Sequence, residues 1–246
     1  MKRSLIVLFA VLFAVSSTVH TQQPCSGDIN DITQCTDEGC GDHPFDPELN
    51  RRKNIRSDDQ QPVLRSYRWM KGLENPTHFN KDNRNRDELK QLGEGQKITV
   101  VAYALFAKQE GAETCNCGLT TKKDTDNHIV LVDPTLKKPT LTAAECCSVT
   151  AEFTPRVRLD HPNFTMEKLN RLIDPAWKSS GKTAPNGKLL VRVTGLLMFD
   201  SQHFLENPLK RDTNWEIHPV LKLEYCADGE TCGADSDANW QNLEDQ

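Results

Sequence analysis

All nine cysteines of this chain lie after an apolar amino-terminal run, and this order decides how they can be used. Lys2 and Arg3 precede the run, which extends from Leu5 to Val15. A basic start followed by an apolar stretch is typical of a secretory signal peptide. The run is shorter than the roughly 20 residues that span a bilayer, and no comparable run follows it. We therefore expect residues 1–21 to be a signal peptide and the mature protein to be secreted or periplasmic, without a transmembrane segment.

Export to an oxidising compartment predicts disulfides, and the odd number of cysteines leaves at least one thiol unpaired. Cys226 and Cys232 bracket a short polar loop and are the pair that the spacing favours most. Cys25, Cys35 and Cys40 are expected to hold the amino-terminal segment together locally. Sequence alone does not pair the remaining cysteines.

Two cysteine doublets lie between these groups: Cys115 with Cys117, and Cys146 with Cys147. Disulfides that join one doublet to the other would staple two loops together. A zinc site made by the four thiolates is an alternative, but neither doublet has the gap of roughly two to four residues that structural zinc sites favour. Redox chemistry by the doublets is a third hypothesis, and it requires a reactive, accessible thiol. The disulfide interpretation is favoured.

After position 96 the chain alternates between polar loops and segments rich in β-branched and aromatic side chains. These segments predict strands over residues 97–107, 128–133, 146–153, 188–199 and 215–225. Apolar residues at helical spacing after Thr165 predict a helix over 165–177. Together these elements predict a mainly β fold, a small antiparallel, OB-like barrel with one inserted helix.

The last predicted strand contains Pro219, which donates no ladder hydrogen bond and therefore predicts an edge or a bulge. Strict alternation along this strand would turn Ile217 toward the barrel core. It would place Glu216, His218 and Val220 together on the opposite face.

The predicted barrel, residues 96–226, is flanked by segments without a sustained strand or helix period. Residues 22–95 are interpreted as a loop-rich, cysteine-containing amino-terminal extension with a short helix over 85–92. Residues 227–246 form an acidic tail that we expect to be mobile.

Two carboxylate and imidazole pairs share one spacing: Asp126 with His128, and Glu216 with His218. Residues two apart on a strand leave the same face about 7 Å apart. If the two strands are neighbours, the four side chains converge into a candidate site for zinc or a similar divalent metal. The alternatives are a solvated outer face around Glu216 and a partly buried, hydrogen-bonded histidine at position 128.

Other polar residues and the charge of the chain narrow the function classes. Asp200 and His203 follow the end of a predicted strand and are explained as the caps of a turn. The chain has no nucleophile elbow, His-Glu-x-x-His helix, phosphate loop or dinucleotide fingerprint. Its net charge of −5 is opposite in sign to that of a typical phosphate-backbone binder, so nucleic acid is disfavoured as a partner.

Three segments of the predicted barrel carry recognisable patterns: an Asp-x-His before an apolar run, a Val-Arg-Val-Thr-Gly strand, and a Glu-x-His-Pro-Val strand. Together with residues 46–54, they resemble a group of secreted bacterial proteins without an assigned activity. The resemblance implies a compact β-barrel core with recurring polar residues at Asp126, His128, Glu216 and His218. It implies no reaction.

Two functional hypotheses follow. The first is a secreted, disulfide-stabilised β-barrel that acts as a binding or structural module for an unidentified extracytoplasmic ligand. The alternative is a metal-dependent hydrolase, for example of phosphodiesters, in which His128 and His218 hold the metal and Glu216 or Asp126 activates water. The sequence does not decide whether the protein is an enzyme.

Overall fold

The computed structural model describes residues 24–41, 46–80, 83–136, 147–179, 183–204 and 211–245. The predicted signal peptide, residues 1–21, and Cys146 lie outside these residues. No helix within the described ranges is long and apolar enough to cross a membrane.

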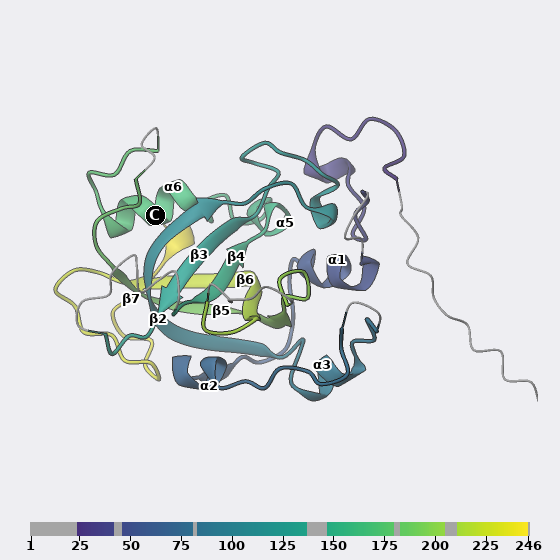
Figure 1. Cartoon of the computed structure of the whole chain (residues 1–246). Coiled ribbons are helices and arrows are strands. Elements are labelled where there is room, and N and C mark those ends of the chain that lie inside the picture. Colours follow the sequence, from purple (N-terminus) through teal and green to yellow (C-terminus); the bar gives the residue numbers. More distant parts are fainter. Residues whose placement is uncertain are drawn as a thin grey trace, which may run out of the picture.

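Five strands close into a barrel, which lies at the centre of Figure 1. They are β2 (Lys97–Gln109), β3 (Asn127–Val132), β4 (Val149–Phe153), β5 (Leu189–Phe199) and β6 (Trp215–Cys226). The order around the barrel is β2, β3, β4, β6, β5, and β5 pairs back to β2. The mainly β, OB-like prediction is therefore confirmed.

One pair of barrel strands, β4 and β6, is parallel, and the other four neighbouring pairs are antiparallel. The barrel is therefore antiparallel, as predicted, at all but one of its strand pairs. A closed ring with an odd number of strands cannot alternate in direction all the way round, so at least one parallel pair is unavoidable. Here the connection from β4 to β5 passes through the helices α5 (Pro155–Arg158) and α6 (Met166–Ile173).

The inserted helix α6 begins and ends where the sequence indicates. The Thr165 hydroxyl caps its first turn by accepting a hydrogen bond from the Lys168 amide. The helix ends at Ile173, because the residue before Pro175 avoids the helical conformation. Asn170 binds the helix to β2 through both the amide and the carbonyl group of Ala107.

The strand β6 contains the bulge that Pro219 predicts. Ile217 pairs with Leu197 and Val220 pairs with Gly195, so His218 and Pro219 together lie opposite one residue. The bulge changes the alternation, and Val220 belongs to the barrel core. The expectation that Val220 shares a face with Glu216 is therefore wrong.

The amino-terminal extension packs against the barrel and contributes to its core. It contains η1 (Ile32–Gln34), α1 (Pro47–Lys53), β1 (Val63–Arg65), α2 (Tyr67–Lys71) and α3 (Asp87–Gln91). In Figure 1, α1 lies to the right of the barrel and α2 and α3 lie below it. The largest apolar cluster of the barrel includes four extension residues: Tyr67, Met70, Phe79 and Leu89.

Three disulfides join described cysteines: Cys25–Cys40, Cys35–Cys117 and Cys226–Cys232. The last is the pair that the spacing favours. Cys147 is also disulfide-bonded.

The pairing of Cys117 with Cys35 differs from the expected link between the two doublets. Cys117 ends the 3₁₀ turn η2 (Thr114–Asn116) in a left-handed conformation and packs with Ile32 and Cys40 of the extension. This disulfide anchors the extension to the barrel and excludes the zinc site of four thiolates. Cys115 is the free cysteine among the described residues.

The acidic tail is partly ordered, contrary to the expectation that it is mobile. Its strand β7 (Trp240–Asn242) pairs with β6, and Leu243 in η3 (Leu243–Asp245) is buried in the core. Arg192 of β5 binds the Asp237 carboxylate and lies 5.1 Å from the Trp240 ring centre. Apolar contacts and the Arg192 guanidinium therefore hold the acidic tail against the barrel.

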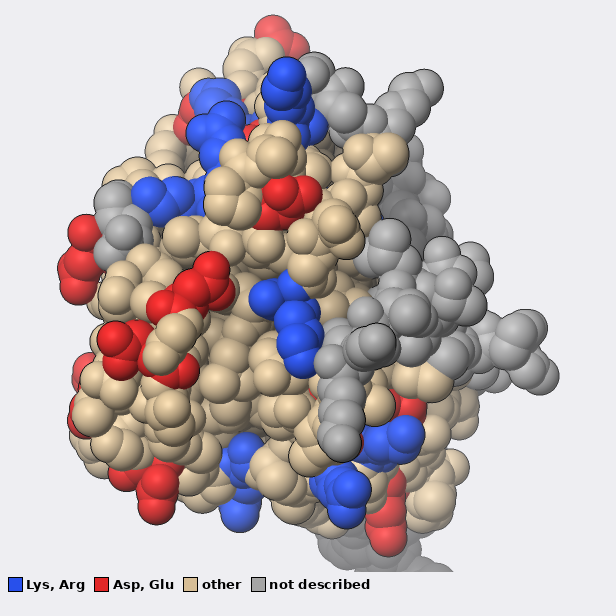
Figure 2. Space-filling model, turned by 90° about the vertical axis from the view of Figure 1, so that its left-hand side faces the viewer, with Lys and Arg blue, Asp and Glu red and all other residues tan. Residues whose placement is uncertain are grey.

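On the face shown in Figure 2, basic and acidic side chains of the described residues are interspersed over a largely uncharged surface. Neither sign forms a continuous stripe in this view. A surface of this kind does not resemble the single-sign track that follows a phosphate backbone.

Candidate functional site

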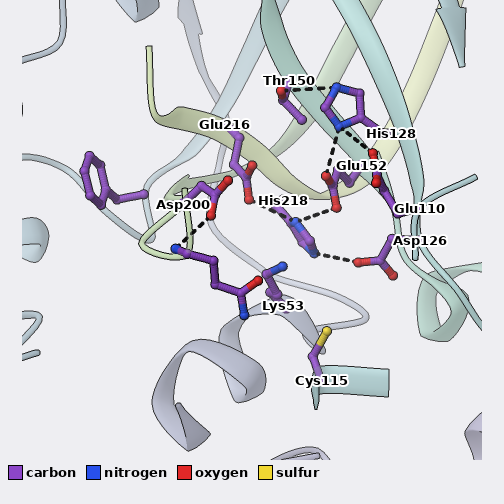
Figure 3. Close-up of polar contacts among 12 residues, drawn as sticks. Lys53, Glu110, Cys115, Asp126, His128, Thr150, Glu152, Asp200, Glu216 and His218 are labelled. Atoms are coloured by element: carbon purple, nitrogen blue, oxygen red, sulfur yellow. Dashed lines mark hydrogen bonds and ion pairs between the residues drawn. The ribbon is translucent and has the colours of Figure 1, made fainter. Parts of the chain in front are cut away.

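A row of polar side chains lies on the outer face of three neighbouring strands. β4 lies between β3 and β6, so the strands that carry His128 and His218 are not themselves paired. Glu152 of β4 pairs with His128, and Thr150 pairs with Glu216. The two predicted pairs therefore lie on the same face, with β4 between them (Figure 3).

The extension and the η2 turn cover this face. His218 is 0% exposed, Asp126 1% and Glu216 2%. The solvated face considered for Glu216 is therefore absent, because α1 packs against β6 and the Arg211 guanidinium lies beside the Glu216 carboxylate.

Hydrogen bonds hold this cover in place. The helix α1 begins at Asp46, whose carboxylate accepts a hydrogen bond from the Leu49 amide. Near its end, Asn50 donates to the Glu38 carbonyl, and Asn54 donates to the carbonyls of Asp37 and Cys115. The contact between Asn54 and Cys115 joins residues 61 apart in the sequence and ties the end of α1 to the η2 turn beside the site.

His218 is enclosed by three carboxylates. Its Nδ1 lies 3.1 Å from Oε1 of Glu216 and 3.2 Å from Oε2 of Glu152. Its Nε2 lies 3.5 Å from Oδ2 of Asp126. Burial alone would lower the pKa of His218, but Glu152 and Glu216 raise that pKa to about 10.

Asp126 pairs with His218 and not with His128 as the spacing suggests. It precedes the first residue of β3, so the two-residue alternation does not extend to it. The Asn116 side chain donates to Oδ1 of Asp126 at 3.0 Å. Burial, together with the nearby Glu113, raises the pKa of Asp126 to about 7.

His128 lies beside the buried cluster and nearer to solvent, with a side chain that is 17% exposed. Its Nδ1 is 3.1 Å from Oε1 of Glu110 and 3.4 Å from Oε1 of Glu152. Burial opposes the charged form, yet these carboxylates raise the pKa of His128 above its ordinary value. The partly buried, partnered histidine is therefore the arrangement found.

Glu152 lies at the centre of the cluster and was not selected from the sequence, and neither were Glu110, Glu113 and Arg211. The two oxygens of Glu152 face different imidazoles, Oε1 toward His128 and Oε2 toward His218. Its signal was the alternation of apolar Val149, Ala151 and Phe153 with polar Thr150 and Glu152. This alternation indicates that the Glu152 side chain faces outward. It does not indicate that β4 lies between β3 and β6.

Asp200 and Arg211 close one end of the cluster. Asp200 accepts hydrogen bonds from the amides of Gln202 and His203, which is the turn cap that the sequence predicts. Asp200 also forms an ion pair with Arg211, whose guanidinium lies 3.4 Å from Oε2 of Glu216. Arg211 thereby supplies positive charge beside the buried carboxylates.

Lys53, Glu113 and Cys115 close the other end. Cys115 Sγ donates to Oε2 of Glu113 at 3.0 Å, and Lys53 Nζ lies 2.7 Å from the same oxygen. Both Lys53 and Cys115 are buried. The row of polar groups is therefore continuous from Arg211 to Lys53.

Three buried atoms in the middle of the row, Asp126 Oδ2, Glu152 Oε2 and His218 Nε2, make no hydrogen bond of regular geometry with the described residues, and their only contacts of this kind are the ion pairs of His218. Asp126, Glu152 and His218 each place a ligand atom within 4.8 Å of the other two. Carboxylate oxygen and imidazole nitrogen are ligands that zinc and similar divalent ions accept. These residues fit such an ion.

A cavity of about 210 Å³ borders His218. Its other walls come from the extension and β5 and include Arg52, Glu94 and Met198. It is smaller than the roughly 300–1,000 Å³ of most small-molecule pockets. The cavity has room for water and small ions next to the imidazole.

No protein-family model matches this sequence, and a search among curated proteins finds no match. The resemblance to secreted bacterial proteins stays a prediction.

Proposed function

We propose that this protein is an exported β-barrel module that binds a divalent cation of the zinc class through Asp126, Glu152 and His218. The observation that carries the proposal is the contact between His218 and Asp126. Glu216 lies within hydrogen-bond distance of Nδ1 of His218, so a neutral His218 keeps its proton on Nδ1 and presents a lone pair on Nε2. Oδ2 of Asp126 lies 3.5 Å from Nε2 in a buried site, where a cation can replace the proton that His218 carries on Nε2 at neutral pH.

The distance between Nε2 of His218 and Oδ2 of Asp126 suits a bound cation. Two ligands at about 2.0–2.1 Å from a tetrahedral ion are roughly 3.3 Å apart, close to the separation of these two atoms. Histidine ligands commonly donate their other ring N–H to a carboxylate, which is the role that Glu216 takes here. In the protein without metal, protons on His218 and Asp126 compensate the same charge, since the pKa values of both groups are raised.

Burial favours binding over the hydrolase that the sequence left open. Catalytic zinc sites keep one position open for water or substrate, whereas structural sites are closed by protein ligands. His218 and Asp126 are almost fully buried, and the adjoining cavity is small. The site therefore fits an ion that stabilises the fold or is held by it.

The extracytoplasmic location is part of this proposal. Three disulfides join described cysteines, as is typical of proteins in oxidising compartments. The apolar amino-terminal run supplies the export signal that such a protein needs.

Metal analysis of the protein secreted by an expression host tests the proposal. After dialysis against zinc at neutral pH, we expect at least one tightly bound equivalent by mass spectrometry. Asp126→Asn and His218→Gln should each lower the bound zinc by one equivalent or more. His78→Gln is the matched control, because the His78 side chain is 84% exposed and distant in the sequence from the site. Zinc-free, folded wild-type protein would refute the proposal, and so would undiminished zinc in both site variants.

A further inference from the structure

Cys115 is a buried free thiol in a protein whose other described cysteines are disulfide-bonded. It is 2% exposed and lies two residues from Cys117, whose disulfide fixes the loop to the extension. Its Sγ points into the polar row (Figure 3). The thiol contacts the Glu113 carboxylate and not another sulfur. Such a neighbour is typical of a metal ligand and not of a cysteine that forms a disulfide.

Glu113, Cys115 and Asp126 form a second group of three ligands. One ligand atom of each lies within 4.8 Å of those of the other two. Asp126 is 1% exposed, and its Oδ2 makes no regular hydrogen bond with the described residues beyond the ion pair with Nε2 of His218 at 3.5 Å. The same carboxylate therefore belongs to two ligand groups, one with His218 and one with Cys115.

We propose that Glu113, Cys115 and Asp126 form a second cation site, which shares the Asp126 carboxylate with the site at His218. A thiolate ligand selects borderline and soft divalent ions, such as zinc and cadmium, over magnesium and calcium. The inference rests on the proposed function, because the first ion and the second are bound by the same aspartate. When the ion binds, the Cys115 thiol releases its proton to solvent and the sulfur donates a lone pair to the metal.

The charges around this second site balance. A Cys115 thiolate with the carboxylates of Glu113 and Asp126 carries three negative charges. A divalent ion supplies two positive charges. Lys53, whose Nζ is 2.7 Å from Oε2 of Glu113, supplies the third. Lys53 therefore acts as a charge-balancing neighbour held in place by α1.

The loop that carries Cys115 is rigidly held before any ion binds. Asn54 donates to the Cys115 carbonyl at 2.9 Å, and Cys40 donates from its amide to the Thr114 carbonyl at 3.0 Å. Gly39 packs so closely that a Cβ there would lie 2.0 Å from the Thr114 carbonyl oxygen. A site whose ligands are ordered by folding loses little conformational entropy on binding, which favours affinity.

Cobalt titration of the full mature protein tests the second site. Cobalt(II) bound to a thiolate gives a near-ultraviolet charge-transfer band, whereas oxygen and nitrogen ligands give only weaker visible bands. We expect two equivalents of cobalt by equilibrium dialysis, together with the charge-transfer band. Cys115→Ser should abolish that band and one equivalent, while the visible bands and the other equivalent remain. Glu113→Gln should lower the affinity for the second cobalt ion by about tenfold or more, and Glu48→Gln, which changes a half-exposed carboxylate on α1, should not.

The outcomes separate the two proposals. One equivalent without the charge-transfer band in wild type overturns the second site and leaves the site at His218 intact. Absence of bound cobalt overturns both. Two equivalents retained by a folded Cys115→Ser variant overturn the role of the cysteine.

Alkylation of wild-type protein provides a test that does not depend on the folding of a variant. We expect stoichiometric cadmium to slow the reaction of Cys115 with N-ethylmaleimide by at least tenfold, as followed by mass spectrometry. An unchanged rate with cadmium bound overturns the proposal.

Discussion

Nε2 of His218 lies 3.5 Å from Oδ2 of Asp126, and both side chains are buried between the barrel and the extension. The two residues are far apart in the sequence and come from a bulged strand and from the residue before β3. Their contact brings together side chains from two separate sequence motifs.

The first prediction concerns the pH dependence of stability after removal of metal with a chelator. Burial opposes the charge on His218, but carboxylates raise its folded-state pKa to about 10, above its ordinary value of 6.5. A raised histidine pKa contributes stability that is complete below pH 6.5 and is lost as pH rises toward 10. We expect the free energy of unfolding to fall by roughly 2.5 kcal/mol between pH 7 and 9.

Urea unfolding followed by circular dichroism measures this change. The His218→Gln variant should lose most of the decrease, and His78→Gln should keep it. If His218→Gln shows the same decrease as wild type, other groups cause the pH dependence. Saturating zinc should reduce the decrease in wild type, because the metal replaces the proton on the imidazole.

The second prediction concerns Glu152, which links the two histidines. Glu152→Gln keeps the shape of the side chain and removes its charge. We expect the pKa of His128 to fall, because Glu152 and Glu110 oppose the effect of burial on that imidazole. We also expect a loss of about 3–5 kcal/mol of stability, because His218 would keep a buried charge with one partner fewer.

Imidazole proton shifts in NMR spectra, recorded across the pH range, measure the His128 pKa directly. Glu110→Gln is the comparison, since it should lower the His128 pKa while leaving His218 unaffected. A His128 pKa that does not change in Glu152→Gln would show that the contact between Glu152 and His128 is unimportant in solution.

The third prediction concerns the cover over the site. The Cys35–Cys117 disulfide joins residues 82 apart, whereas Cys226 and Cys232 are 6 apart. Closing the longer loop restricts the unfolded chain more. The expected contribution to stability is about 4 kcal/mol for the longer loop and about 2 kcal/mol for the shorter loop. We expect Cys35→Ser with Cys117→Ser to destabilise the protein about twice as much as Cys226→Ser with Cys232→Ser.

Hydrogen exchange distinguishes loss of the cover from general destabilisation. In the Cys35/Cys117 double variant, amides of α1 and of the η2 turn should exchange faster than those of β2 and β5. The Cys226/Cys232 double variant should leave α1 protected. If amide exchange is uniformly faster in both double variants, the Cys35–Cys117 disulfide does not anchor the extension.

The sequence could predict the barrel because the alternation of apolar and polar residues is local. The apolar side chains at the odd positions of β5, Leu189, Val191, Val193, Leu197 and Phe199, all belong to the barrel core. Glu216 and His218 could be selected for the same reason, whereas Asp126 was selected by its spacing from His128 and contacts His218 instead. Glu152 could not, because the order in which strands pair around the barrel depends on contacts between distant segments.

Two other failures have physical causes that a local pattern does not contain. Pro219 signals a bulge, but not that the bulge turns Val220 into the core. The burial of Glu216 depends on the extension, which is held over the strand by a disulfide between Cys35 and Cys117. A pattern along one strand cannot show what another part of the chain places above it.

The last prediction concerns Gly195, which faces the bulge that carries His218. A Cβ at Gly195 would lie 2.3 Å from the Pro219 carbonyl oxygen and 2.6 Å from Cγ2 of Ile217. Since the first contact is with backbone, relief requires β5 and β6 to move apart at the bulge. We expect Gly195→Ala to cost about 3 kcal/mol of stability and to weaken zinc binding, because His218 moves with Pro219.

Gly111→Ala is the control for Gly195→Ala. A Cβ at Gly111 meets nothing within 4 Å, so this variant should change stability by less than about 0.5 kcal/mol. Chemical unfolding and zinc competition on both variants provide the measurement. If Gly195→Ala is destabilised but binds zinc as tightly as wild type, the bulge supports the barrel without positioning the imidazole, and the ion is held elsewhere.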